Sequence, residues 1–102
     1  MRIDDFSKWL EVHTDLGTRA QSDAKSRCKR IEKYEGDLDQ HFINDSMFDL
    51  LERFKYSRHD QEAGISLKHK IIIKGDEVNG TASLLNAANL YYKFCLASPP
   101  KK

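Results

Sequence analysis

The sequence has 102 residues, with 17 basic and 16 acidic side chains and a formal net charge of +1. A chain of this length forms one domain with a small core. The near balance of charge excludes a polybasic tail protein, and the 10% share of aromatic residues excludes an acidic disordered segment, which has few aromatics. We expect a single helical domain over residues 1–98 and a frayed tail over 99–102.

The chain has no run of about 20 apolar residues of the kind that spans a membrane. Its first residues, Met1–Asp5, lack the apolar stretch of a signal peptide. We therefore expect a cytoplasmic protein with no membrane partner. The two cysteines, Cys28 and Cys95, fall on the apolar sides of predicted helices and are expected to be buried thiols.

The spacing of apolar side chains predicts one helix over residues 4–15 and a second over 18–35. Gly17 and Gly36 mark the ends of these two helices. The second helix carries a narrow stripe of small and apolar residues, which indicates close packing against a neighbouring helix. The stripe consists of Ala20, Ala24, Cys28 and Ile31.

Two shorter helices are predicted over residues 37–43 and 47–54, and a loop over 58–67. The run His69–Lys74 then contains three consecutive β-branched residues, which favour an extended chain. We expect this segment to lie with Ile71 and Ile73 inward, against the helices or paired with a short strand.

Residues 75–80 read as a turn, because Asn79-Gly80 is a strong turn signal. The last helix is then predicted over 81–96, with Thr81 or Asn79 as its N-cap. The predicted fold is mainly α: a compact four-to-five-helix bundle with one short extended or β segment at about 69–74 before the last helix.

The small net charge conceals a block pattern along the chain. Residues 19–33 contain six basic and two acidic side chains, and residues 53–74 contain the same numbers. Between them, residues 35–52 contain six acidic side chains and no Lys or Arg. Opposite blocks can neutralise each other or form separate faces, and which of these holds decides the function.

On a helical wheel, five of the six cations of the second helix share a face of about 140°, opposite the apolar stripe, whereas Arg27 falls at the edge of the core. Like charges four residues apart repel each other by about 0.2–0.5 kcal/mol. A face that accepts this repulsion, with serines between the cations, is typical of a phosphate-contacting surface, although a plain solvated face has the same pattern. Its candidate DNA-contacting residues are Arg19, Lys25, Lys29, Arg30 and Lys33.

A second candidate strip lies at the predicted N-terminus of the last helix. Free backbone N–H groups and the helix dipole favour an anion at such a point. An ordinary turn with an N-cap is the alternative interpretation. The residues expected to contact phosphate here are Lys70, Lys74, Thr81 and Ser83.

No motif in the sequence carries catalytic chemistry. The four histidines do not pair with cysteine at zinc-site spacing, and there is no HExxH, phosphate-loop or nucleophile motif. We therefore expect no enzyme activity, no metal and no cofactor.

A resemblance extends over residues 6–95. Its segments are Phe6-x-x-Trp9-Leu10, Ser26-Arg27-x-Lys29-Arg30-Ile31-Glu32, Asp37-Leu38-Asp39, Leu50-Leu51-Glu52-x-Phe54-x-Tyr56-Ser57-x-x-Asp60, His69-Lys70-Ile71-x-Ile73-x-Gly75 and Asn79-Gly80-Thr81-Ala82-Ser83. Together they resemble a small helical domain that precedes nuclease modules in bacterial restriction, defence and mobile-element proteins. The last helix, with Ser83, Leu84, Ala87, Tyr91 and Phe94, is similar to the end of the SAM-like core-binding domain of tyrosine recombinases.

This resemblance implies DNA binding through helices and their N-termini, and it carries over no catalytic residue. Proteins of that kind continue into a nuclease or recombinase domain, whereas this sequence stops at Lys102. The leading hypothesis is thus a non-catalytic DNA-binding domain that contacts the phosphate backbone.

Two alternatives remain open at this point. A protein-interaction module or small inhibitor would use the acidic block 35–52 against a partner such as a nuclease module or a defence complex. Self-association would use aromatic residues exposed on the last helix, such as Tyr91 or Tyr92 and Phe94; the sequence leaves the oligomeric state unknown. The candidate partner-binding acids are Asp37, Asp39, Asp45 and Asp49.

Overall fold

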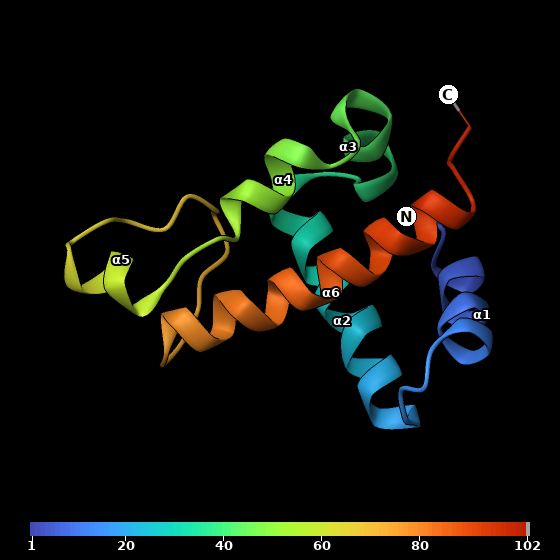
Figure 1. Cartoon of the computed structure of the whole chain (residues 1–102), viewed down its shortest axis with the longest axis horizontal. Helices are drawn as coiled ribbons and strands as arrows, with labels where there is room; N and C mark the ends of the chain where they lie inside the picture. The colour runs from blue at the N-terminus through green and yellow to red at the C-terminus, as the bar shows by residue number, and fades with distance from the viewer. Residues whose placement is uncertain (102) are drawn as a thin grey trace.

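The computed structural model describes residues 1–101, and within them the chain forms six helices and no β-strand. The two long helices are α2 (Thr18–Glu35) and α6 (Glu77–Ala97). They cross, with α2 behind α6 in Figure 1. The shorter helices are α1 (Ile3–His13), α3 (Leu38–Asp45), α4 (Phe48–Arg53) and α5 (Arg58–Glu62). The expectation of a mainly helical bundle is confirmed.

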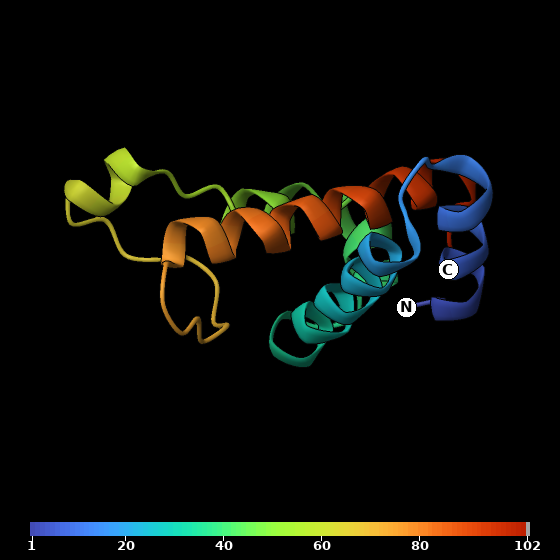
Figure 2. The ribbon, with the colours of Figure 1, turned by 90° about the horizontal axis from the view of Figure 1, so that it is seen from below.

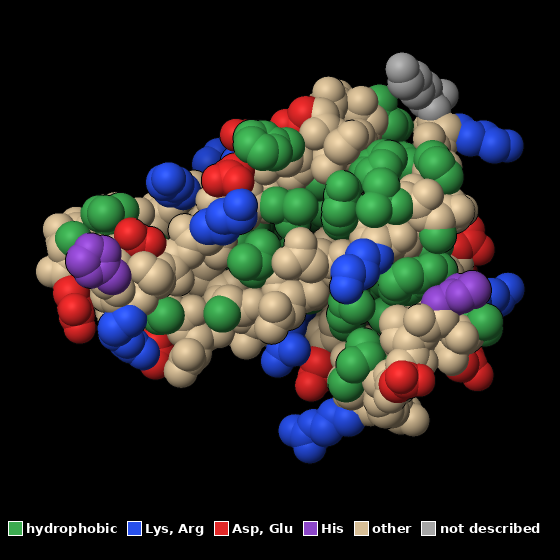
Figure 3. Space-filling model, viewed as in Figure 1, with side chains coloured by type: hydrophobic (Ala, Val, Ile, Leu, Met, Phe, Trp, Pro, Cys, Tyr) green, Lys and Arg blue, Asp and Glu red, His purple; other side chains and the backbone are tan. Residues whose placement is uncertain are grey.

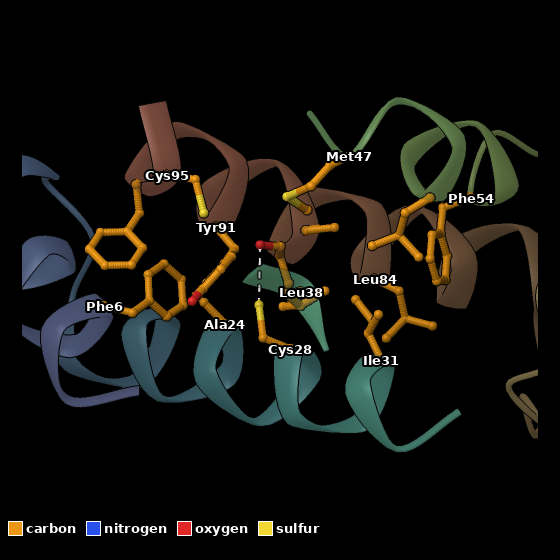
Figure 4. Packing of buried hydrophobic residues seen from close by; sticks show 14 of the residues in the cluster. Phe6, Ala24, Cys28, Ile31, Leu38, Met47, Phe54, Leu84, Tyr91 and Cys95 are labelled. Carbon is orange, nitrogen blue, oxygen red and sulfur yellow. Dashed lines mark hydrogen bonds between the residues drawn. The ribbon is translucent and has the colours of Figure 1, made fainter. Parts of the chain in front are cut away.

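The packing of α2 against α6 forms the centre of the core. Ala24, Cys28 and Ile31 of the predicted stripe are buried, and Ala20 lies at its exposed end. Figure 4 shows Ala24, Cys28 and Ile31 on the side of α2 that faces α6, with the Cys28 thiol donating a hydrogen bond to the backbone carbonyl of Ala87 at 3.4 Å. Both cysteines are buried free thiols.

The helix α1 closes one end of the core through aromatic contacts. Phe6 is fully buried, and its ring centroid lies 4.9 Å from that of Tyr91 and 5.6 Å from that of Phe94. Figure 1 shows α1 beside the C-terminal end of α6, with α5 at the opposite end of the molecule.

The predicted loop over 58–67 is wrong in its first half, because residues Arg58–Glu62 form α5. The helix begins with a capping box, in which the Ser57 hydroxyl accepts from the Asp60 backbone N–H and the Asp60 carboxylate accepts from the Ser57 N–H. Two backbone donors are thereby satisfied reciprocally. The short helix is held by this local pair, and none of its residues is buried.

The β segment expected at 69–74 is absent from the described chain. Residues 70–74 have no regular secondary structure, because no second strand lies alongside to supply a ladder. The expected orientation is confirmed, however: Ile71 is 3% exposed, Ile73 packs against the core, and Ile72 is 67% exposed.

The turn predicted over 75–80 is also wrong, because α6 begins at Glu77. The Asp76 carboxylate is the N-cap and accepts from the backbone N–H groups of Val78 at 3.0 Å and Asn79 at 3.2 Å. Gly80 lies inside the helix. A Cβ atom at Gly80 would lie 2.7 Å from Cγ2 of Ile73, so glycine is needed here for the close approach of Ile73 and not for a turn.

Candidate nucleic-acid interface

An open groove of about 530 Å³ lies between α2, residues 72–76 and the first turns of α6. Figure 2 shows the C-terminal half of α2 and the segment before α6 projecting on the same side of α6. We call this hollow the basic groove, because three cations line it: Arg27, Arg30 and Lys74. Ser83, Ile72 and Tyr34 also line it.

The wall on α2 follows from helical spacing. Arg27, Arg30 and Tyr34 stand at positions i, i+3 and i+7, which lie on one side of a helix. This side adjoins the buried stripe that contains Ile31, so the three side chains emerge at the edge of the core. The edge of the core thus supplies the groove with two guanidinium groups and one aromatic ring.

The opposite wall is held in place by a buried polar cluster. The Glu35 carboxylate, whose side chain is 1% exposed, accepts from the Lys70 backbone N–H at 3.2 Å. The ring of His69 stacks on Phe54, its Nδ1 accepts from the Ile71 N–H at 3.2 Å, and its Nε2 lies 2.9 Å from the Thr81 hydroxyl. These contacts hold the segment that carries Lys74.

The positive charge of the groove has little counter-charge. Arg27, Arg30 and Lys74 form no ion pair within residues 1–101. The one carboxylate that lines the groove, Asp76, caps α6 and pairs with Arg58 at 3.0 Å. This pairing with Arg58, together with the backbone hydrogen bonds, lowers the pKa of Asp76. The groove is therefore open to an anion from outside.

The structure brings together members of both predicted strips. Arg30 comes from the cationic face of α2, and Lys74 and Ser83 come from the strip near the last helix. The sequence interpretation missed Arg27, which it placed at the edge of the core, and Tyr34. The i, i+3, i+7 spacing with Arg30 is the signal that could have found both.

Thr81 does not line the basic groove, which corrects the expectation that it contacts a phosphate. Its side chain is fully buried beside His69. The expected anion site at its backbone is also excluded, because α6 begins at Glu77 and the Asp76 carboxylate already occupies the free N–H groups. The Ser83 hydroxyl donates to the Asn79 carbonyl at 3.0 Å, and Ser83 lines the groove.

The other predicted cations are spread over the surface outside the groove. Lys25 donates to the Ser7 hydroxyl of α1 at 3.0 Å, and Lys33 lies 5.6 Å from the Tyr34 ring centroid. The remaining ones are exposed: Arg19, Lys29 and Lys70. Lys29 and Lys33 therefore extend the positive surface along α2.

The carboxylates of the acidic block form hydrogen bonds and ion pairs within the molecule. Asp37 caps α3, and Asp39 pairs with Arg2 at 3.2 Å. Asp45 accepts from the Asp49 backbone N–H at 3.0 Å, and Asp49 pairs with Arg53. The carboxylates that were expected to bind a partner are therefore already bonded to cations and backbone N–H groups of this chain.

The aromatic residues expected to mediate self-association are mostly in the core. Tyr91 is fully buried and Phe94 is 2% exposed, while Tyr92 is half-buried. Figure 3 nonetheless shows hydrophobic side chains gathered over α6 and the neighbouring helices on the face it displays. The exposed apolar residues of the chain include Phe48 of α4 and Leu96 of α6.

Within residues 1–101, no group of three or more His, Cys, Asp or Glu side chains is placed to hold a metal ion. Nor is any helix in the described part of the chain long and apolar enough to cross a membrane. Comparison with protein-family models, curated proteins and solved structures gives no match to this chain. The basic groove is therefore the feature of this chain on which a function can be proposed.

Proposed function

We propose that this protein is a non-catalytic DNA-binding domain that holds backbone phosphates in the basic groove. The observation that carries the proposal is the convergence of Arg27, Arg30 and Lys74 on one open groove without an ion-pair partner among residues 1–101. Cations that served only stability would gain by pairing, as Arg53 does with Glu35 and Asp49.

Phosphate fits this arrangement by geometry and charge. A guanidinium group offers a planar fork of donors that matches two phosphate oxygens, and lysine adds a mobile point charge. Exposed Lys29 and Lys33 would meet neighbouring phosphates along α2. Most of the affinity is then electrostatic and falls as salt rises.

The acidic block favours this function over a protein-interaction module. Its carboxylates cap helices and pair with Arg2 and Arg53, so a partner would have to displace intramolecular bonds. An anion that binds in the basic groove does not have to displace an ion pair within residues 1–101. A protein partner such as a nuclease module is part of the proposal that follows from the resemblance, and the cytoplasmic location is a part that follows from the sequence pattern; neither follows from the groove.

The test is a binding titration with fluorescent DNA of random sequence at about 50 and 200 mM salt. The groove variant is Arg27→Gln/Lys74→Gln. Its matched control is Lys8→Gln/Lys93→Gln, which removes the same charge from exposed residues that do not line the groove. We expect binding at low salt that the groove variant loses and the control retains. Absence of binding at low salt, or equal loss in both variants, would contradict the proposal.

A further inference from the structure

The basic groove has a second property that backbone phosphates do not use. The aromatic ring of Tyr34 and the aliphatic side chain of Ile72 line it together with the cations. Ile72 is 67% exposed even though both its neighbours turn inward. An exposed aliphatic side chain costs free energy in water, and here it is placed within a cationic hollow.

The shape of the hollow bears on which form of nucleic acid fits. Its volume of about 530 Å³ lies in the range of small-molecule sites. The bases of a duplex are stacked inside the helix, so only its phosphates could reach the cations of a recessed groove. An unpaired nucleotide, in contrast, can present its phosphate and the flat face of its base to the same groove.

The polar and apolar parts of the groove match the two parts of such a nucleotide. Aromatic side chains of proteins that bind single strands stack on bases, and basic side chains follow the backbone. Tyr34 is half-buried against the core, so one edge of its ring is fixed. Tyr34 follows Arg27 by seven residues and Arg30 by four on α2, so its ring lies on the same side of the helix as both guanidinium groups.

We infer that the basic groove binds an unpaired nucleotide of single-stranded DNA, with the phosphate at Arg27 and Lys74 and the base against Tyr34 and Ile72. This inference rests on the proposed function and names the form of DNA that the groove takes. Because any base has an apolar face, the groove binds without strong sequence preference.

The experiment compares three fluorescent 12-nucleotide probes at one low salt concentration: single-stranded oligothymidine, the same backbone with abasic sites, and a blunt duplex. We expect oligothymidine to bind at least about fivefold more tightly than the abasic strand, which is the lower range for stacking of one base. The duplex should also bind more weakly than oligothymidine.

Two variants separate stacking from charge. Tyr34→Leu should lower the affinity for oligothymidine by about fivefold or more and leave the abasic strand unchanged, whereas Tyr34→Phe keeps the wild-type affinity. Ile72→Ser should act in the same direction. Its matched control is Val12→Ser, on an exposed valine of α1 that does not line the groove. Because Ile72 and Val12 are both exposed, this pair remains decisive if Tyr34→Leu fails to fold.

The outcomes distinguish the two proposals. Equal binding of duplex and single strand, or equal effects of Tyr34→Leu on all three probes, overturns the inference. If the duplex binds and only Arg27→Gln/Lys74→Gln abolishes this binding, the proposed function stands and the single-strand inference falls. If none of the probes binds, both fall.

Discussion

The guanidinium group of Arg30 donates a hydrogen bond to the backbone carbonyl of Ile72, 42 residues further along the chain. This bond joins the two walls of the basic groove, since Arg30 lies on α2 and Ile72 lies in the segment before α6. Arg30 therefore positions the segment that carries Lys74, in addition to contributing charge. Arg27 lines the same groove but makes no ion pair within residues 1–101.

The two arginines should therefore respond differently to neutralisation. Arg30→Gln is expected to speed the hydrogen exchange of backbone amides at residues 71–74, because the segment loses one of its two hydrogen bonds to side chains of α2 and keeps the one from Lys70 to Glu35. Arg27→Gln removes the same charge and should leave this exchange unchanged. Exchange followed by mass spectrometry or NMR measures the difference. Equal exchange in both variants would show that the bond from Arg30 does not hold the segment.

Gly80 is expected to have a substitution effect that depends on Ile73. Alanine normally stabilises a helix interior by about 1 kcal/mol relative to glycine. At Gly80, however, the new Cβ would lie 2.7 Å from Cγ2 of Ile73. This atom is fixed close to the backbone by β-branching, so Gly80→Ala should destabilise the protein by about 1–3 kcal/mol through overpacking.

A double-mutant cycle isolates the cause of that effect. In an Ile73→Ala background the colliding atoms are gone, so Gly80→Ala should raise the free energy of unfolding by up to about 1 kcal/mol. Urea denaturation of the four proteins measures each step. A destabilisation of the same size in both backgrounds would locate the strain elsewhere.

Two carboxylates of the acidic block, Asp39 and Asp49, should contribute unequally to the free energy of unfolding. Asp39 has a side chain that is 16% exposed, pairs with Arg2, and accepts from the Tyr91 hydroxyl at 2.7 Å. Asp39→Asn should cost about 1–3 kcal/mol, because the fully buried Tyr91 and the Arg2 guanidinium lose a charged acceptor. Asp49 is 63% exposed and bonds to Arg53 four residues later. Asp49→Asn should cost no more than about 0.5 kcal/mol, and urea midpoints that reversed this order would contradict the assignment.

Stability should fall as the pH falls below neutrality because of His69. Burial lowers the pKa of His69 from its ordinary value of 6.5; Glu35 and Glu77 raise it, and Arg30 lowers it. Since Nδ1 accepts from the Ile71 N–H, the folded protein favours the neutral ring. Below pH 6.5 the unfolded chain binds a proton that the folded chain resists, so the stabilisation is present above 6.5 and is lost as the pH falls toward the folded pKa.

The measurement is the free energy of unfolding between pH 7.5 and 5.0 for the wild type, His69→Gln and His59→Gln. The part of the pH dependence that His69 causes should vanish in His69→Gln and persist in His59→Gln, whose histidine is exposed. An NMR titration of the His69 ring gives an independent readout if His69→Gln is too unstable to study. A ring pKa at or above 6.5 would refute the account.

The sequence predicted α1 and α2 well because their apolar residues repeat with the helical period and glycines follow both. It placed the start of α6 four residues too late, because Asn79-Gly80 has the composition of a turn. The actual reason for Gly80 is the approach of Ile73 from outside the helix. No local pattern within residues 75–83 contains that information.

The candidate site was predicted in pieces. The sequence assigns Arg30 to one strip, and Lys74 and Ser83 to another. A helical wheel describes a single helix, so it cannot show that the two strips lie side by side. The structure joins them because Glu35 and His69 fix the intervening segment against α2 and α6. The sequence places Thr81 at an expected helix end, whereas in the structure it lies inside the core.

The salt dependence of DNA binding shows directly whether the basic groove holds a phosphate. The logarithm of the affinity is plotted against the logarithm of salt concentration for the wild type, Lys74→Gln and Lys93→Gln. If Lys74 neutralises a phosphate, its removal should make the slope shallower by about 0.7–0.9, while Lys93→Gln leaves the slope unchanged. Identical slopes for the wild type and Lys74→Gln would contradict a phosphate in the basic groove.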